Sequence, residues 1–195
     1  LISEISSEEL ITIIRDLELD EIVDILQNLP NQKTENILSA MSQRDRLRIQ
    51  EALEYPEDSA GGLMNTDIIS VRPKHNLEVV MRYLRAQREL PKNTDQIFVV
   101  SRENKYLGSL PISLIVVSDP SLNVRELMET ETQPLEANLN DKDVSRLFEQ
   151  NDWVSAPVVD DQSRLIGRIT IDDVVDVIME DADQNFLGMA GVAED

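Results

Sequence analysis

Five acidic side chains near the end of the sequence have the types and spacing to do chemistry. They are Asp172, Asp173, Asp176, Glu180 and Asp183. Spacings of three and four residues make such side chains neighbours on a helix, where like charges repel by a few tenths of a kcal/mol per pair. No Lys or Arg follows Arg168 to relieve that repulsion. Carboxylate oxygens are the ligands that Mg²⁺ and Ca²⁺ prefer, so the pattern predicts a divalent-cation site. The alternative is an acidic helix face exposed to solvent.

The overall composition favours a cation over other kinds of partner. The chain has 195 residues and a formal net charge of −20, and residues 121–195 alone carry 18 acids and 5 bases. Nucleic acids and anionic membranes bind through Lys and Arg, so this charge argues against both. Cysteine is absent. Disulfides and thiolate chemistry are therefore excluded, and a reducing, cytoplasmic location is the simplest expectation.

No catalytic constellation accompanies the acidic helix. His75 is the sole histidine and lacks a serine arrangement that suggests a triad. Gly61-Gly62 lacks the Lys-Ser/Thr of a phosphate loop, so we interpret it as a hinge or turn. The chain is therefore expected not to be an enzyme.

The first 56 residues predict a set of short amphipathic helices. Apolar residues recur at helical spacing from Leu10 to Leu17 and from Ile22 to Leu29, and two further helices are expected over about residues 33–41 and 43–54. Ser6 and Glu9 have the spacing of a capping box before the first helix. Helices of this length suggest a small bundle or part of an α-solenoid. No apolar run approaches the roughly 20 residues that span a bilayer.

An internal duplication follows the helical segment. Residues 63–67 return as 127–131, and residues 99–110 return as 158–169. The offset falls from 64 to 59, so the first copy has five extra residues between its helix and its next strand. Each copy reads as a βαββα unit, and two such units are expected to pack sheet to sheet. The prediction is an α+β fold in which the acidic helix closes the second copy.

The second copy resembles a cystathionine-β-synthase (CBS) domain. The resemblance rests on an apolar strand that contains a proline, residues 156–160, and on Gly-x-apolar-Thr-x-x-Asp over residues 167–173. The first copy has Pro111 and Leu114 where the motif requires Thr and Asp. The resemblance therefore implies the CBS fold for both copies and the polar motif for the second only.

The sequences flanking the pair narrow the resemblance to the cytosolic part of the MgtE family of magnesium transporters. The short helices lead into residues 55–64 (YPEDSAGGLM), and a helix beyond the second copy enters residues 185–191 (NFLGMAG). This order implies a helical N-domain remnant (1–56), CBS repeats at 57–123 and 124–183, and the start of a connecting plug helix (184–195). It also implies a CBS-mediated homodimer on the cytoplasmic face of the membrane. The transmembrane pore domain would be absent from this chain.

The resemblance implies that Mg²⁺, with Ca²⁺ or Mn²⁺ as alternatives, binds among these parts and holds the pore closed. The residues that carry this expectation are Asp152, Asp173, Asp176 and Asp181, followed by Asp172, Glu180 and Asp183. Gln184-Asn185 provides amides where acids would strengthen the family pattern.

A second function class stays open, a CBS module that senses adenine nucleotides. By the same resemblance Thr170 and Asp173 would contact the phosphate and ribose of ATP, and Trp153 would stack on the adenine. Trp153 as a buried core anchor is the competing interpretation. Asp173 cannot easily serve a cation and a ribose at once, and the first copy provides no acidic partner for such a site.

Overall fold

The computed structural model describes residues 14, 17, 19–27, 29–87, 89–179 and 182. The helical segment contains α2 (Leu19–Gln27), α3 (Asn31–Ala40) and α4 (Gln43–Ala52), which confirms the last three predicted helices. Their apolar faces share one small core that includes Ile22, Leu26, Ile37 and Ile49. The predicted capping box at Ser6 and Glu9 lies outside the described residues, as does most of the first predicted helix.

Each repeat forms the expected βαββα unit, which confirms the α+β fold class. The elements of the first repeat are β1 (Ser70–Val71), α6 (Leu77–Ala86), β2 (Gln96–Val100), β3 (Tyr106–Pro111) and α7 (Ile112–Val117). Those of the second are β4 (Leu135–Glu136), α9 (Asp141–Asn151), β5 (Ser155–Val159), β6 (Leu165–Thr170) and a closing helix over residues 171–179. In both sheets the first strand runs parallel to the second, and the third antiparallel to it.

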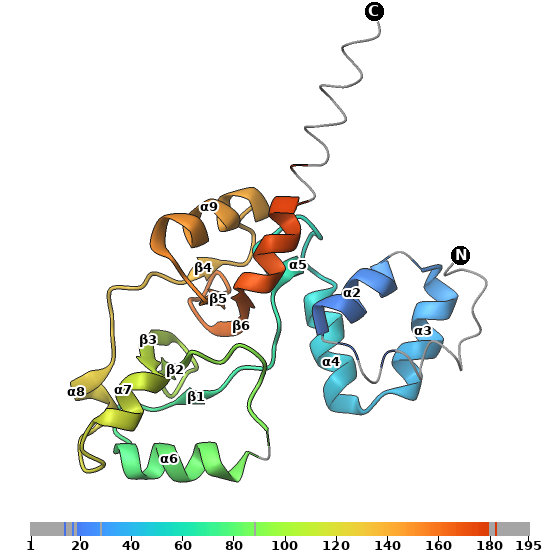
Figure 1. Ribbon diagram of the computed structural model, residues 1–195. Coiled ribbons are helices and arrows are strands. Elements are labelled where there is room, and N and C mark those ends of the chain that lie inside the picture. The colour runs from blue at the N-terminus through green and yellow to red at the C-terminus, as the bar shows by residue number, and fades with distance from the viewer. Residues whose placement is uncertain are drawn as a thin grey trace, which may run out of the picture.

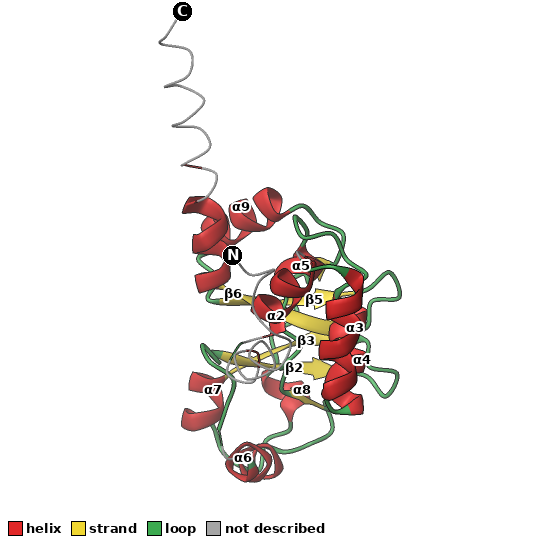
Figure 2. Cartoon of the chain, turned by 90° about the vertical axis from the view of Figure 1, so that its right-hand side faces the viewer, coloured by secondary structure: helices red, strands yellow, loops and turns green. Residues whose placement is uncertain are grey.

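The two sheets pack against each other around an approximate twofold axis. Figure 2 shows them adjacent, with α9 beyond one sheet and α6 beyond the other. Between them lies a cluster built from Phe98, Val100 and Leu165. Lys105 forms a β-bridge with Arg164, its own counterpart at offset 59. This pairing of equivalent positions confirms the sheet-to-sheet contact expected from the duplication.

The segment that enters each repeat completes the core of the other repeat. α5 (Ala60–Leu63) precedes the first sheet, yet Ala60 and Met64 are buried with residues of the second repeat such as Phe148. Conversely, α8 (Val124–Leu127) precedes the second sheet, and Val124 is buried in the core of the first repeat. Figure 1 shows α5 beside the second repeat and α8 beside the first. The core of each repeat is therefore completed by the segment that leads into the other repeat's sheet.

The interpretation of Gly61-Gly62 as a hinge or turn is wrong, because both glycines are buried within α5. A β-carbon on Gly61 would overlap the ring of Tyr55, and one on Gly62 would lie 2.6 Å from the carbonyl oxygen of Glu57. The Ala60 and Gly61 amides donate hydrogen bonds of 2.7 and 2.8 Å to Leu139 and Ala137. These glycines permit close packing of α5 rather than movement.

Candidate functional site

The acidic closing helix begins with a local network around Thr170. The Thr170 amide and hydroxyl donate hydrogen bonds of 3.2 and 3.0 Å to Asp173 Oδ2. Thr170 is the residue just before the helix, and Asp173 is its third residue. When the third side chain accepts from the backbone amide of the residue before the helix, the pair forms one half of a capping box. The Thr-x-x-Asp motif of residues 170–173 therefore stabilises the start of the helix that carries the acids.

Asp172 faces the first repeat. Its Oδ1 accepts hydrogen bonds from the Thr170 hydroxyl and, at 3.0 Å, from the side-chain amide of Asn93. Partial burial opposes ionisation of Asp172, but the hydrogen bonds from Thr170, its own backbone and Asn93, with the positive charge of Arg168, outweigh it and lower the pKa. Asp172 is therefore a contact between repeats.

The remaining predicted metal ligands do not come together in the described part of the chain. Asp176 is exposed on the closing helix, and exposed Asp152 ends α9 in a left-handed conformation (φ 53°, ψ 39°). Glu180, Asp181, Asp183 and the amide pair Gln184-Asn185 lie outside the described residues. Within the described residues, no group of three His, Cys, Asp or Glu side chains is placed to hold a metal ion.

Trp153 contributes to the core of the second repeat. It is half-buried, and its ring meets that of Phe148 edge to face, with centroids 5.7 Å apart. Such a pair adds about 0.5–1.5 kcal/mol to the burial of the two rings. This geometry matches the core-anchor interpretation of Trp153.

Arg168, on β6, joins the motif to the first repeat. Its side chain is only 5% exposed, and Nε and Nη2 donate to the carbonyl oxygens of Asp67 (3.1 Å) and Lys92 (2.5 Å). Nη1 is 3.4 Å from the carbonyl oxygen of Asn93. A buried guanidinium is tolerated only when its donors are satisfied, and backbone carbonyls satisfy it here. The sequence analysis did not identify Arg168, although it occupies the position of Ser109 in the first repeat.

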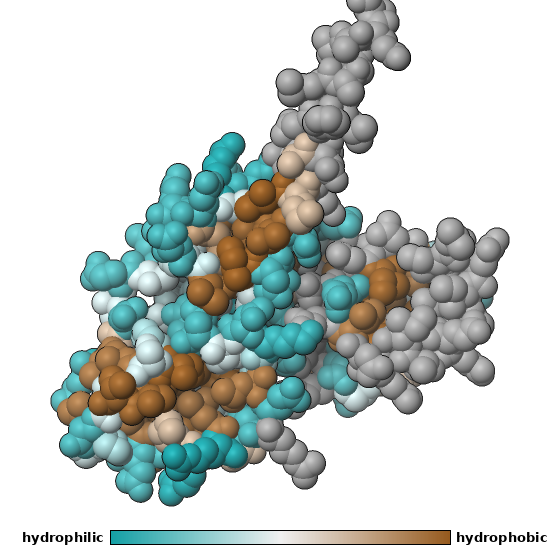
Figure 3. All heavy atoms as spheres, viewed as in Figure 1, coloured by the Kyte–Doolittle hydropathy of each residue, from teal (hydrophilic) through white to brown (hydrophobic). Residues whose placement is uncertain are grey.

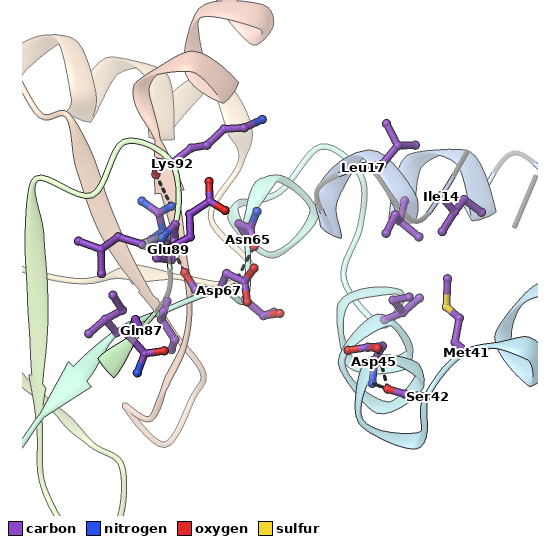
Figure 4. Close-up of a pocket in the computed structure, with 18 of the residues that line it drawn as sticks. Ile14, Leu17, Met41, Ser42, Asp45, Asn65, Asp67, Gln87, Glu89 and Lys92 are labelled. Atoms are coloured by element: carbon purple, nitrogen blue, oxygen red, sulfur yellow. Dashed lines mark hydrogen bonds between the residues drawn. The ribbon is translucent and has the colours of Figure 1, made fainter. Parts of the chain in front are cut away.

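A cavity of about 840 Å³ separates the helical domain from the CBS pair. Figure 4 shows Asp45 of α4 on one side of it, and Asp67 and Glu89 of the first repeat on the other. Asp45 Oδ2 accepts a 2.6 Å hydrogen bond from the Ser42 hydroxyl at the start of α4. The sequence analysis missed these three acids because they are far apart in the chain. Residues 1–56 carry 12 acids and 5 bases, which is a signal for Asp45 but not for Asp67 or Glu89.

The cavity and the predicted nucleotide site differ in what they offer to the two implied ligands, Mg²⁺ and ATP. Carboxylates from two domains around a cavity are the donor type that a hydrated Mg²⁺ takes, since Mg²⁺ retains several waters and needs few direct ligands. At the site predicted for an adenine nucleotide, the side chains that would contact the ligand already have partners within the chain. The Thr170 hydroxyl and Asp173 bond to each other, and Asn93 already donates to neighbouring Asp172.

Comparison with known proteins assigns both halves of the chain. Residues 1–58 match the MgtE intracellular N domain, and residues 60–116 and 124–180 match the CBS domain. Magnesium transporter MgtE of Thermus thermophilus is 30% identical over 177 residues, which cover 89% of this chain and 39% of that protein. The Bacillus subtilis magnesium transporter MgtE is 24% identical over 92% of this chain and 40% of its own length.

Solved structures agree with these assignments. The cytosolic domain of the Mg²⁺ channel MgtE, in complex with ATP, is 29% identical and superposes with a TM-score of 0.79 over 90% of this chain and 77% of that one. The soluble part of a magnesium transporter, 24% identical, shares the fold with a TM-score of 0.85 over 93% of this chain and 71% of that one. Among the described residues, no helix is both long and apolar enough to cross a membrane. Built from an MgtE intracellular N domain followed by two CBS domains, the chain belongs to the MgtE family.

Proposed function

We propose that the chain is the cytosolic, Mg²⁺-sensing regulatory part of a magnesium transporter. One observation carries the proposal: Asp45 of the helical domain shares a cavity with Asp67 and Glu89 of the CBS pair. These acids come from two domains on opposite sides of the cavity, so a cation between them would draw the two domains together. The names of the relatives supply the identity of the cation.

The physical basis is the charge that closure brings together. Asp45 would approach Asp67 and Glu89, and Lys92 and Arg168 on the same wall offset part of their repulsion. Like charges a few ångströms apart at an effective dielectric constant near 20 repel by about 4 kcal/mol, so a cation among the three acids would favour closure. A divalent cation that binds the closed arrangement more tightly than the open one shifts the population toward closure. High Mg²⁺ therefore favours the compact state, and low Mg²⁺ releases it.

The closing helix supplies the second set of carboxylates in this proposal. Asp172 and Asp173 already accept hydrogen bonds from Thr170. Exposed Asp176 is therefore better placed to bind a cation than Asp172 or Asp173. Asp152, which is exposed just before β5, is the other candidate among the described residues. Asp181, with Glu180 and Asp183, remains part of the proposed set. A partner surface would complete these sites, because they are not complete within the described part of one chain.

A homodimer through the CBS pair would provide such a surface. Two helix faces expose apolar side chains, at Val116 and Val117 of α7 and at Val175, Ile178 and Met179 of the closing helix. Figure 3 shows hydrophobic surface over both helices. Exposed apolar patches of this kind mark association surfaces. In this proposal, closure of the dimer would reach the membrane through a transmembrane pore domain outside the given sequence.

Calorimetric titration with MgCl₂ tests the proposal. Wild type is expected to give a saturable heat of binding, and Asp45→Asn with Glu89→Gln is expected to weaken that binding at least severalfold. Glu149→Gln, an exposed acid on α9 away from the cavity, is the matched control and should bind like wild type. A parallel titration with ATP tests the nucleotide alternative. Absence of Mg²⁺ binding together with clear ATP binding would favour that alternative.

A further inference from the structure

The first repeat carries a longer connection between its helix and its second strand than the second repeat does. Residues 87–95 join α6 to β2, whereas residues 152–154 join α9 to β5. Of this connection we call residues 89–95 the strap. Because the two repeats are otherwise equivalent, the strap is a feature that the basic βαββα fold does not require.

One side of the strap is fixed to the second repeat. The Lys92 and Asn93 carbonyl oxygens accept from Arg168, and the Asn93 amide donates to Asp172. Asn93 has φ of 52°, a left-handed conformation that asparagine tolerates and that turns the strap toward the motif. Asp95 Oδ1 accepts a 2.5 Å hydrogen bond from the Ser155 hydroxyl. The strap therefore contacts β5, β6 and the start of the closing helix.

The other side of the strap forms part of the cavity wall. Glu89, Leu90, Pro91 and Lys92 line the cavity opposite residues of the helical domain that include Met41 and Asp45. Figure 4 shows Glu89 and Lys92 on the CBS side, with Met41 and Asp45 across the cavity. One short segment thus connects the surface that faces the helical domain with the residues that begin the acidic helix.

We propose that the strap couples docking of the helical domain to the position of the closing helix, with Asn93, Arg168 and Asp172 as its latch. While the latch holds, the cavity wall and the closing helix move as one unit. When the latch opens, the wall loses its attachment to the second repeat. The latch exists on one side only, because Ser109 replaces Arg168 at the equivalent position of the first repeat. This inference rests on the proposed function for the cation but adds the path of communication.

Two latch variants and one control test the proposal. Asn93→Ala removes the amide that donates to Asp172, and Arg168→Lys keeps the charge but loses the planar fork. Asn151→Ala is the matched control, because it removes a comparable side-chain bond, of 2.7 Å to Leu147 O, away from the strap. Far-UV circular dichroism confirms that each variant is folded. Asn93 is exposed, so Asn93→Ala should fold and can test the proposal alone if the Arg168 variant does not fold.

The first readout is amide hydrogen exchange over residues 89–95. Loss of one hydrogen bond to a charged group is expected to raise exchange of the strap about tenfold in Asn93→Ala and not in Asn151→Ala. The second readout is the distance distribution between spin labels at Glu35→Cys and Glu149→Cys, which are exposed sites in a chain without native cysteine. The change that MgCl₂ causes in this distribution should shrink by at least half in the latch variants.

The outcomes separate the two proposals. If MgCl₂ changes the label distance in wild type, and both latch variants respond like wild type with unchanged strap exchange, the strap proposal is overturned. If MgCl₂ changes nothing in wild type, the cation proposal fails, while faster strap exchange in Asn93→Ala still supports the latch.

Discussion

Met64, in the segment that leads into the first sheet, packs over Gly167 in the last strand of the second repeat. A β-carbon added at Gly167 would lie 2.6 Å from Met64 Sδ and 3.0 Å from the carbonyl oxygen of Asn65. The backbone follows the same path, since the Asn65 and Arg168 amides exchange hydrogen bonds of 2.8 and 2.9 Å with each other's carbonyl oxygens. The segment that leaves the helical domain is therefore anchored in the second repeat, in the same core as Val174 of the closing helix.

Gly167→Ala should destabilise the chain by about 1–3 kcal/mol, because the added methyl group overpacks a contact that includes backbone. Urea unfolding followed by circular dichroism measures the loss. Glu149→Ala, on the exposed face of α9, is the control and should stay within about 0.5 kcal/mol of wild type. Equal stability of Gly167→Ala and wild type would mean that Met64 does not pack over this strand.

Met64→Ala should unfold the second repeat more easily, although Met64 lies in the segment that leads into the first sheet. Truncation of a buried methionine costs about 2–5 kcal/mol, and Met64 is 2% exposed in the core shared with Phe148. Trp153 is the sole tryptophan and lies against Phe148, so its fluorescence reports on this core. The urea midpoint of that signal should fall, whereas Glu149→Ala at an exposed position of α9 should leave it in place.

Asp172 should titrate below the ordinary aspartate pKa of 3.8, because hydrogen bonds and Arg168 outweigh its partial burial. A lowered pKa in the folded state stabilises the fold above the unfolded value, and that contribution is lost as pH falls through the folded value. Carboxyl-carbon NMR measures the titration. Asn93→Ala removes one of the donors and should raise the pKa of Asp172 toward 3.8. An unshifted Asp172 in wild type would contradict the described latch.

Val117→Glu should weaken self-association without loss of fold. Val117 is 80% exposed on α7, so it contributes little to the core of one chain, and a charge there disfavours an apolar interface. Sedimentation velocity over a range of concentrations measures the effect. Gln150→Glu, at an exposed position of α9, adds the same single charge and is the control. Unchanged association in Val117→Glu would exclude α7 from the dimer surface.

Much of the fold could be predicted from the sequence because the duplication is visible in it. Matching residues fixed the order of strands and helices in both copies, and the periodicity of residues 19–52 fixed three helices. The exchange of α5 and α8 was not predictable, because each entry segment has the apolar composition that either core would accept. Gly61-Gly62 was misread for a related reason, since the sequence did not reveal that Tyr55 packs against α5.

The candidate site was less predictable than the fold. The acidic stripe on the closing helix was evident from spacing, but spacing could not show that Asp172 and Asp173 bond to Thr170. Cavity acids such as Asp45 and Glu89 come together only through the packing of two domains. The role of Arg168 depends on backbone carbonyls of the strap, which have no signature in side-chain identity.

The central claim is that Mg²⁺ closes the helical domain onto the CBS pair. Its most direct test is the electron-spin distance between labels at Glu35→Cys on α3 and Glu149→Cys on α9, measured during titration with MgCl₂. Closure by Mg²⁺ should shift the distribution to shorter, narrower distances as Mg²⁺ rises, and EDTA should reverse the shift, which Asp45→Asn with Glu89→Gln should weaken. A distribution that stays the same from zero to saturating Mg²⁺ would contradict it.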